Sequence, residues 1–211
     1  MNFSLKKINK YCEAHTSPVQ DVLLRLERET NLKTLAPQMA SGPYQGKLIE
    51  LLVRMARPKM VLEIGTFTGY SSICIGLALS EDAILHTIEA NRELQFISQK
   101  YIKEAGLENK IVSHVGDALS LIPTLDAKFD MVFIDAGKRD YAQYFDLIIY
   151  KINPNGIILA DNVLWSGKVV DSKKDNDTNI IDAFNKKIHE DERVENITLP
   201  IRDGLTIAVK I

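Results

Sequence analysis

From Met60 onward the chain alternates short apolar runs with longer segments of helical periodicity, and this alternation limits its fold more than any other feature. The apolar runs predict strands at 61–64, 84–88, 111–115, 131–134 and 157–160. The segments between and after them predict helices at 70–79, 92–105, 141–150 and 179–189. Continuous apolar strands separated by helices are typical of a parallel sheet covered on both faces. We therefore expect an α/β fold.

The first fifty-odd residues are expected to be helical. Ser17 and Pro18 predict the N-cap and first turn of one helix, and residues 31–38 predict a connector. A second helix is expected to follow Ser41 and to end near Met55. Its predicted apolar face consists of four residues: Leu48, Leu51, Leu52 and Met55.

The end of the chain predicts an antiparallel hairpin. Two strand-like runs, 194–199 and 205–211, are joined only by the short link 200–204, which suits a hairpin at one edge of the sheet. Residues 166–178 are polar and predict a mobile surface loop. We expect one domain over residues 1–211, with a helical extension at 1–57 and a Rossmann-like core at 58–211.

Composition excludes several classes of protein. The 211 residues carry 26 Lys and Arg against 28 Asp and Glu, a net charge of −2 that gives no general attraction to nucleic acid. No run of about 18 apolar residues could span a membrane, and residues 1–15 lack the apolar stretch of a secretory signal. Cys12 and Cys74 form no CxxC pair, which argues against a disulfide framework or a zinc site. We expect a cytoplasmic protein.

A glycine turn follows the first predicted strand. Gly65 permits close approach of a ligand, and the next helix offers free N–H groups at its start. Phe67 stands where a dinucleotide site carries its second glycine and would crowd a pyrophosphate. The acid Glu63 instead suits a cationic ligand, and S-adenosylmethionine (SAM) is the obvious cationic cofactor. Each of these features also fits an ordinary turn.

Further acids follow the second and third strands. A carboxylate at Glu89 is placed to accept both ribose hydroxyls, and Gly116-Asp117-Ala118 suits the adenine edge. Taken singly, each acid is explained equally well as a cofactor ligand and as an ordinary loop residue. Three acids after three successive strands favour a cofactor site.

A second acidic group follows strands four and five. Asp135, Asp161 and Asn162 would meet at the same sheet edge, and three hard oxygen donors suit Mg²⁺, Mn²⁺ or Ca²⁺. Helix capping by Asp135 and Asn162 is the alternative. Lys138 lies three residues after Asp135, near enough to this group to act as a general base; the alternative is a solvated loop cation. Trp165 either walls an aromatic substrate or belongs to the core.

These residues resemble the cation-dependent O-methyltransferases related to catechol and caffeoyl-CoA O-methyltransferases, a class of SAM-dependent methyltransferases. The resemblance extends from Met39 to Ile211. The matching signals are Met39-Ala40-Ser41 with Gln45-Gly46, Glu63-Ile64-Gly65 with Gly69-Tyr70-Ser71, Glu89, Gly116-Asp117-Ala118, Asp135 with Lys138, Asp161-Asn162, and Asp203-Gly204-Leu205.

The resemblance implies a Rossmann-like, doubly wound sheet of seven strands, the last antiparallel. It implies that SAM is bound by Met39, Ser41, Glu63, Gly65, Ser71, Glu89, Asp117, Ala118 and Asp135. It further implies that Asp135, Asp161 and Asn162 hold a divalent cation, Mg²⁺ above all. Lys138 is then the general base, with Asp135 also in the catalytic group. Lys138 and Trp165 are expected to face a small catechol-like acceptor, and a homodimer is expected.

Three positions depart from the family pattern. Caffeoyl-CoA enzymes usually carry an acid at the position of Gly137, which disfavours a plant-type thioester substrate. Ile197 occupies the region where animal catechol enzymes have a glutamate, and Arg202 replaces an expected small residue.

Three other functions stay open. A bacterial branch of the family resembles tRNA 5-hydroxyuridine O-methyltransferases, for which Lys6, Lys7, Lys10, Arg25 and Arg28 would supply a basic surface. A nicotinamide oxidoreductase is disfavoured by Phe67. A non-catalytic SAM-binding subunit that activates a partner is disfavoured by the intact acidic group.

Overall fold

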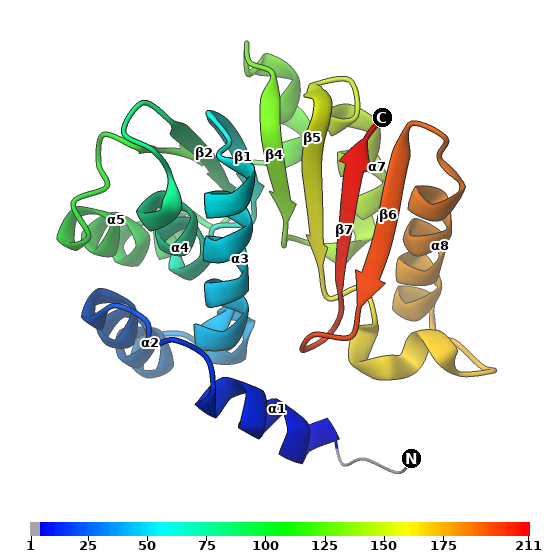
Figure 1. Ribbon diagram of the computed structural model, residues 1–211, viewed down its shortest axis with the longest axis horizontal. Coiled ribbons are helices and arrows are strands. Elements are labelled where there is room, and N and C mark those ends of the chain that lie inside the picture. The colour runs from blue at the N-terminus through cyan, green and yellow to red at the C-terminus, as the bar shows by residue number, and fades with distance from the viewer. Residues whose placement is uncertain (1–4) are drawn as a thin grey trace.

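The computed structural model describes residues 5–211, with side chains from residue 7 onward, so residues 1–4 of the expected helical extension and the Lys6 side chain lie outside the described residues. Seven strands form one sheet in the order β3-β2-β1-β4-β5-β7-β6 (Figure 1). They are β1 Met60–Ile64, β2 Ile84–Glu89, β3 Ile111–Val115, β4 Phe129–Ile134, β5 Ile152–Asp161, β6 Val194–Leu199 and β7 Leu205–Lys210. Strands β1 to β5 are parallel, and β7 pairs antiparallel with β5 and β6. The predicted α/β fold and terminal hairpin are confirmed.

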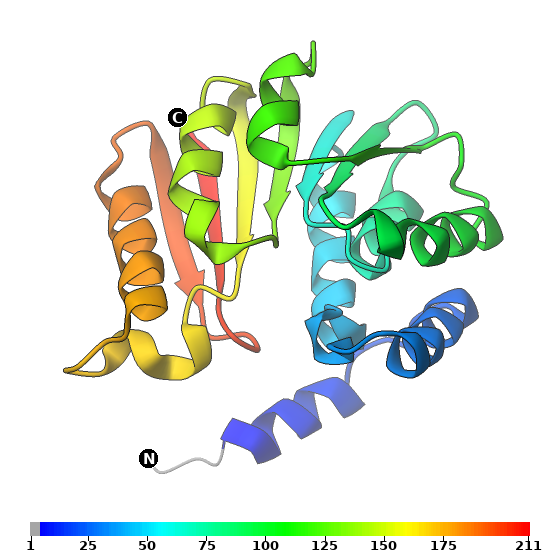
Figure 2. The same ribbon diagram turned by 180° about the vertical axis from the view of Figure 1, so that it is seen from behind.

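The helices form layers on both faces of the sheet (Figures 1 and 2). They are α1 Leu5–Ala14, α2 Asp21–Lys33, α3 Gly42–Ala56, α4 Tyr70–Ala78, α5 Gln95–Glu104, α6 Ala118–Leu121, α7 Tyr141–Ile148 and α8 Asn176–Glu190. The short 3₁₀ helices are η1 Pro37–Met39, η2 Arg92–Leu94, η3 Ile122–Thr124, η4 Lys138–Asp140 and η5 Trp165–Val170. Figure 1 shows α3 in front of the end of β1 with α4 beside it, and Figure 2 shows α7 and α8 against the opposite face.

Alternation along the central strands divides the core into two halves. In β1, Val61 packs with α2 to α5, whereas Leu62 and Ile64 pack with α7 and α8. In β4, Met131 and Phe133 face the first of these halves. Because successive side chains point to opposite faces, every residue of a strand covered on both sides must be apolar or satisfied by partners. Glu63 is therefore exceptional, since it lies fully buried in the middle of such a strand.

Three predictions near the N-terminus need correction. Ser17 and Pro18 lie in the linker before α2, whose N-cap is Gln20, and α2 continues into the predicted connector as far as Lys33. The buried face of α3 consists of Gln45, Gly46, Ile49, Glu50 and Val53. Leu51 and Met55 are 48% and 71% exposed. The other two predicted residues, Leu48 and Leu52, are partly buried and pack against the core, as predicted. The prediction was wrong for Leu51 and Met55, because a small residue and two polar residues occupy the fully buried positions and apolarity alone does not reveal them.

The predicted loop 166–178 is also partly wrong. Its first part is η5, with Ser166 and Gly167 at positive φ, and its last part is the first turn of α8. Asp175 caps α8 by accepting a hydrogen bond from Thr178 N at 2.8 Å, and it also pairs with Lys168 at 3.1 Å. Local hydrogen bonds therefore order a segment whose composition is typical of a loop. Within residues 5–211, no helix combines the length and apolarity needed to cross a bilayer.

Candidate active site

The turn after β1 joins the ends of two strands. Gly65 has φ +103°, and its N–H donates to Ile88 O at 2.9 Å. A Cβ at this position would lie 2.1 Å from Asp135 O, which is too close for any side chain. Positive φ and lack of space both require glycine here. The glycine thus lets the β1 turn contact the segment after β4, whereas the close approach of a ligand to this turn stays a prediction.

Glu63 lies just before this turn, and none of the side chains that the structure describes forms an ion pair with it. Its Oε2 accepts hydrogen bonds from Thr87 Oγ1 at 2.5 Å and from Ser72 Oγ, whereas Oε1 has no partner. Burial raises the pKa of Glu63 from 4.5 to about 7, against the lowering effect of the surrounding hydroxyls. An unpartnered, fully buried carboxylate oxygen favours a cationic ligand, because such a ligand would supply the missing charge.

Two other predicted cofactor residues, Glu89 and Asp117, hydrogen bond to nearby main-chain N–H groups. Glu89 Oε2 accepts from Phe67 N at 2.7 Å, and its Oε1 accepts from Asn91 N at 2.8 Å, so the carboxylate orders the glycine turn. Asp117 caps α6 through Leu119 N and Ser120 N, which agrees with the ordinary loop interpretation. Four more predicted residues are distributed over other elements: exposed Met39 ends η1, buried Ser41 precedes α3, buried Ser71 lies in α4, and buried Ala118 begins α6.

The acidic group forms where β4 and β5 end. Ile134 pairs with Ala160, which places Asp135 and Asp161 as the next residues on neighbouring strands. Lys138 Nζ donates to Asp135 Oδ1 at 3.0 Å, and Asn162 N donates to Asp161 Oδ1 at 2.8 Å. The capping alternative is not seen at either residue, because the N-cap of η4 is Gly137 and that of η5 is Leu164, each without a side-chain hydrogen bond.

The donor set fits a hard divalent cation. Within the described residues, no three side chains among His, Cys, Asp and Glu form a metal site, so the predicted set depends on the amide oxygen of Asn162 as its third ligand. Burial, followed by the negative charge of Asp135, raises the pKa of Asp161 to about 6. A cation held at Asp161 would offset this unfavourable charge.

Sequence reasoning missed Tyr141 as a functional residue. Its buried hydroxyl accepts a hydrogen bond from Lys138 Nζ at 2.7 Å and donates toward Ile134 O at 3.2 Å and Asp161 O at 3.1 Å. The spacing of three from Lys138 was the available signal, because it places the two side chains on one side of a helical turn.

Gln45 was quoted as a family signal but was not assigned to the site. Its Nε2 donates to Asp161 Oδ2 at 2.6 Å, across 116 positions of sequence. No pattern within the sequence relates these two positions, so only the tertiary structure reveals their contact.

Trp165 and Ile197 lie in different parts of the molecule. Trp165 is half-buried at the start of η5 and packs against the core half that contains α7 and α8. This agrees with its core alternative and leaves the substrate alternative untested. Ile197 is exposed on β6 at the edge of the sheet.

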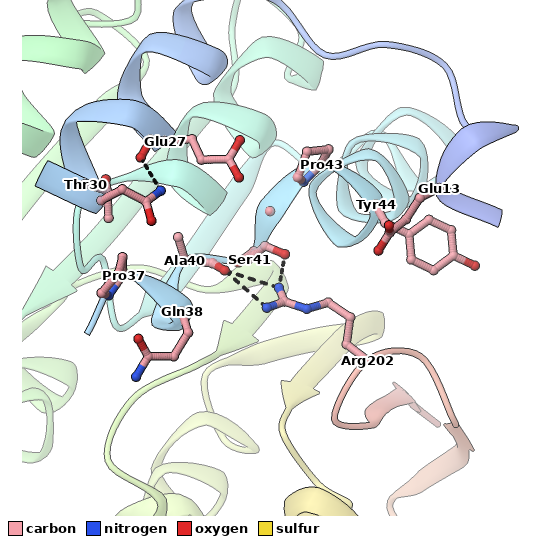
Figure 3. Close-up of a pocket in the computed structure, with 12 residues that line it drawn as sticks. Glu13, Glu27, Thr30, Pro37, Gln38, Ala40, Ser41, Pro43, Tyr44 and Arg202 are labelled. Carbon is pink, nitrogen blue, oxygen red and sulfur yellow. Dashed lines mark hydrogen bonds between the residues drawn. The ribbon is translucent and has the colours of Figure 1, made fainter. Parts of the chain in front are cut away.

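A cavity of about 390 Å³ opens on the N-terminal side of the site (Figure 3). Its walls come from η1, the first turn of α3, α2 and Arg202. Figure 3 shows the Arg202 guanidinium directed at the main chain of Ala40 and Ser41. The cavity lining includes Ser41 but neither Asp135 nor Lys138.

Comparison with known proteins gives a consistent result. The model of the O-methyltransferase family matches residues 13–211. The caffeoyl-CoA O-methyltransferase of Stellaria longipes is 30% identical over 185 residues, which are 82% of this chain and 77% of that protein. The catechol O-methyltransferase of Niastella koreensis is 37% identical over 139 residues, 64% of this chain and 63% of that protein.

A solved structure extends this likeness to the fold. The O-methyltransferase TomG from Streptomyces achromogenes, solved in complex with SAM, superposes with a TM-score of 0.87 at 33% identity. The match covers 97% of this chain and 96% of that one.

Proposed function

The chain belongs to the O-methyltransferase family, and from this premise we propose that it transfers a methyl group from SAM to a hydroxyl of a small catechol-like acceptor with the help of a divalent cation. The observation that carries this proposal is the group of side chains at the ends of β4 and β5. There Lys138 joins the carboxylate of Asp135 to the buried phenol of Tyr141, and that phenol donates toward the main-chain oxygen of Asp161. Such a set can hold a cation and accept a proton at adjacent positions.

The cofactor is proposed to lie along the ends of β1, β2 and β3. Its sulfonium supplies an electrophilic methyl carbon. The unpartnered Oε1 of buried Glu63 supports a cationic ligand, and Glu89 lies at the end of the next strand for the ribose hydroxyls. The full proposed contact set is Met39, Ser41, Glu63, Gly65, Ser71, Glu89, Asp117, Ala118 and Asp135.

Asp135, Asp161 and Asn162 are proposed to hold the cation, with Mg²⁺ as first choice. When bound, a divalent cation lowers the pKa of a hydroxyl in contact with it and orients two neighbouring acceptor oxygens. Hard oxygen donors support this choice over zinc.

Lys138 is proposed to take the acceptor's proton at Nζ. The acceptor oxygen then forms its bond to the methyl carbon while the carbon–sulfur bond breaks and its electron pair stays on sulfur. Alignment of these three atoms is chiefly a positioning effect, and contacts of Lys138 with Asp135 and Tyr141 hold the base in place. Trp165 is proposed to wall the acceptor. Residues 166–178 are proposed to act as a lid, and the working unit is proposed to be a homodimer.

Mass-spectrometric detection of methyl transfer from SAM to a simple catechol acid tests the proposal. Product with Mg²⁺ and none with a chelator is the expected result. Equal product in both would remove the cation from the proposal. No product in either, with SAM still bound, would favour tRNA as acceptor or a partner-dependent role.

Arg25, one candidate for a tRNA-binding surface, already pairs with Glu104 at 3.1 Å.

A further inference from the structure

Arg202 occupies a backbone position that is unfavourable for it. It lies in the turn between β6 and β7 with φ +51°, in the left-handed region that favours glycine. A non-glycine residue there is strained relative to glycine, because its Cβ comes close to the neighbouring carbonyl oxygen. The backbone therefore gives no reason for an arginine, and its side chain must supply one.

The guanidinium of Arg202 contacts a segment that is 157 to 162 positions away in sequence. Nη1 and Nη2 each donate to Ala40 O at 3.3 Å, and Nη1 also donates to Ser41 O (Figure 3). Nη1 further donates to Gln45 Oε1 at 3.1 Å. The planar guanidinium thus joins the C-terminal turn to the start of α3.

The contact with Gln45 determines which way its amide faces. Gln45 is 1% exposed, with Arg202 donating to its oxygen and Asp161 Oδ2 accepting from its nitrogen at 2.6 Å. The flipped amide would place a donor against the guanidinium and an acceptor against the carboxylate, so both contacts would become repulsive. One orientation only satisfies both partners.

We propose that Arg202 is a positioning residue that acts through Gln45 to fix the carboxylate of Asp161. The inference rests on the proposed function, since Asp161 is a proposed cation ligand. With Oδ2 held by Gln45 and Oδ1 by Asn162 N, both carboxylate oxygens have a defined direction. Asp203 anchors the same turn from the other side, because its main-chain oxygen accepts from Leu164 N at 2.8 Å. The turn between β6 and β7 therefore orders both the segment before α3 and the residues after β5.

Arg202→Gly is the informative variant because glycine suits this backbone and the fold is expected to survive. Arg57→Gly is the matched control. Arg57 is also a non-glycine residue at positive φ, +49°, but it lies at the opposite end of α3 from Gln45. Gln45→Met and the double variant Arg202→Gly/Gln45→Met complete the set.

The first measurement is the side-chain amide signal of Gln45 in ¹H–¹⁵N NMR, assigned by its loss in Gln45→Met. We expect Arg202→Gly, but not Arg57→Gly, to move this signal toward the position of a free amide. The second is Mn²⁺ affinity by electron paramagnetic resonance. Loss of the residue that orients a ligand typically weakens binding about 10-fold or more, so we expect that loss in Arg202→Gly. Because Arg202 is proposed to act through Gln45, the double variant should bind Mn²⁺ no more weakly than Gln45→Met alone.

Each outcome decides one part of the argument. An unmoved Gln45 signal, or a moved signal with unchanged Mn²⁺ affinity, would overturn the positioning role. Absence of Mn²⁺ binding by the wild-type protein would refute the proposed cation site and with it the role of Arg202 toward that site. The NMR signal would then still report whether Arg202 orders Gln45, so the two failures are distinguishable.

Discussion

Lys138 donates a 2.7 Å hydrogen bond to the hydroxyl of Tyr141, and that hydroxyl in turn donates toward the main chain of both β4 and β5. Burial, reinforced by the charges of Asp135 and Asp161, raises the pKa of Tyr141 well above its ordinary value. The phenol therefore stays protonated and can serve only as a fixed partner for the lysine. It links the proposed base to the strand that carries Asp161.

Tyr141→Phe is expected to lower both stability and turnover. It removes the partner of Lys138 and leaves Ile134 O and Asp161 O without this donor, at a cost of about 1–3 kcal/mol. We expect turnover to fall about 10-fold, because a displaced base loses part of its effect. Urea unfolding and steady-state kinetics measure the two losses. A similar loss of turnover in Tyr144→Phe, which lies one turn later in α7, would assign the effect to the helix as a whole.

Lys138→Ala is expected to reduce turnover by about 10² or more, the range of general-base catalysis. Binding of SAM, measured by calorimetry, should change little because Lys138 contacts only one residue of the proposed cofactor set, Asp135. Arg139→Ala is the control, since Arg139 is the exposed next residue and pairs only loosely with Asp177, at 3.6 Å. Equal activity of Lys138→Ala and Arg139→Ala would identify Lys138 as an ordinary surface cation.

Asp161→Ala and Asn162→Ala are each expected to abolish the part of turnover that Mg²⁺ stimulates, while SAM binding persists. Each variant removes one hard oxygen donor from the proposed set. Activity measured across a Mg²⁺ titration, with a chelator as the zero point, tests this expectation. Asp126→Ala, at an exposed loop position, should titrate like the wild type. Full stimulation of both site variants would contradict the metal role.

Glu63 is expected to make the stability of the ligand-free protein depend on pH. Its pKa is raised from 4.5 to about 7, so the native state holds this proton to higher pH than the unfolded chain does. Stability is therefore lost as pH rises from about 4.5 through about 7, by up to about 3 kcal/mol. SAM should reduce this loss, because its positive charge favours the ionised carboxylate.

Chemical unfolding across pH 4.5 to 8 measures this slope. Glu63→Gln should reduce it to the part contributed by Asp161, whose pKa is also raised, to about 6, whereas Glu108→Gln, at an exposed position, should retain the full slope. A wild-type slope that persists unchanged in Glu63→Gln would assign the pH dependence to other groups.

Gly65→Ala is expected to destabilise the protein far more than an alanine at an open glycine. The new Cβ would lie 2.1 Å from Asp135 O, so the ends of β1 and β4 must separate. We expect a loss of about 3 kcal/mol or more, together with loss of SAM binding. Gly167→Ala isolates the backbone contribution, because Gly167 has φ +78° and nothing within 4 Å of an added Cβ. That control should lose only about 1 kcal/mol. Equal losses in the two variants would refute the close-contact explanation.

Local pattern predicted most of the fold because burial on both faces leaves a direct record in sequence. The run at 131–134 is apolar because β4 is covered on both faces, and the hairpin link 200–204 was too short for another connection. Pattern failed where polar atoms are buried with partners. The face of α3 that carries Gln45 and Glu50 is invisible to an apolarity count, and the order of 166–178 depends on caps and ion pairs.

The sequence by itself therefore determined the strand ends, the glycine turn and the acids Glu63, Asp135 and Asp161, since each depends on residues that are neighbours along the chain. Only the tertiary structure decided that Gln45 contacts Asp161 across 116 positions and that Arg202 contacts Gln45 across 157. The physical reason is that a hydrogen bond between distant segments leaves no periodicity in either one. It exists because the sheet order places β5 beside β7 and the packing of α3 brings its first turn over both.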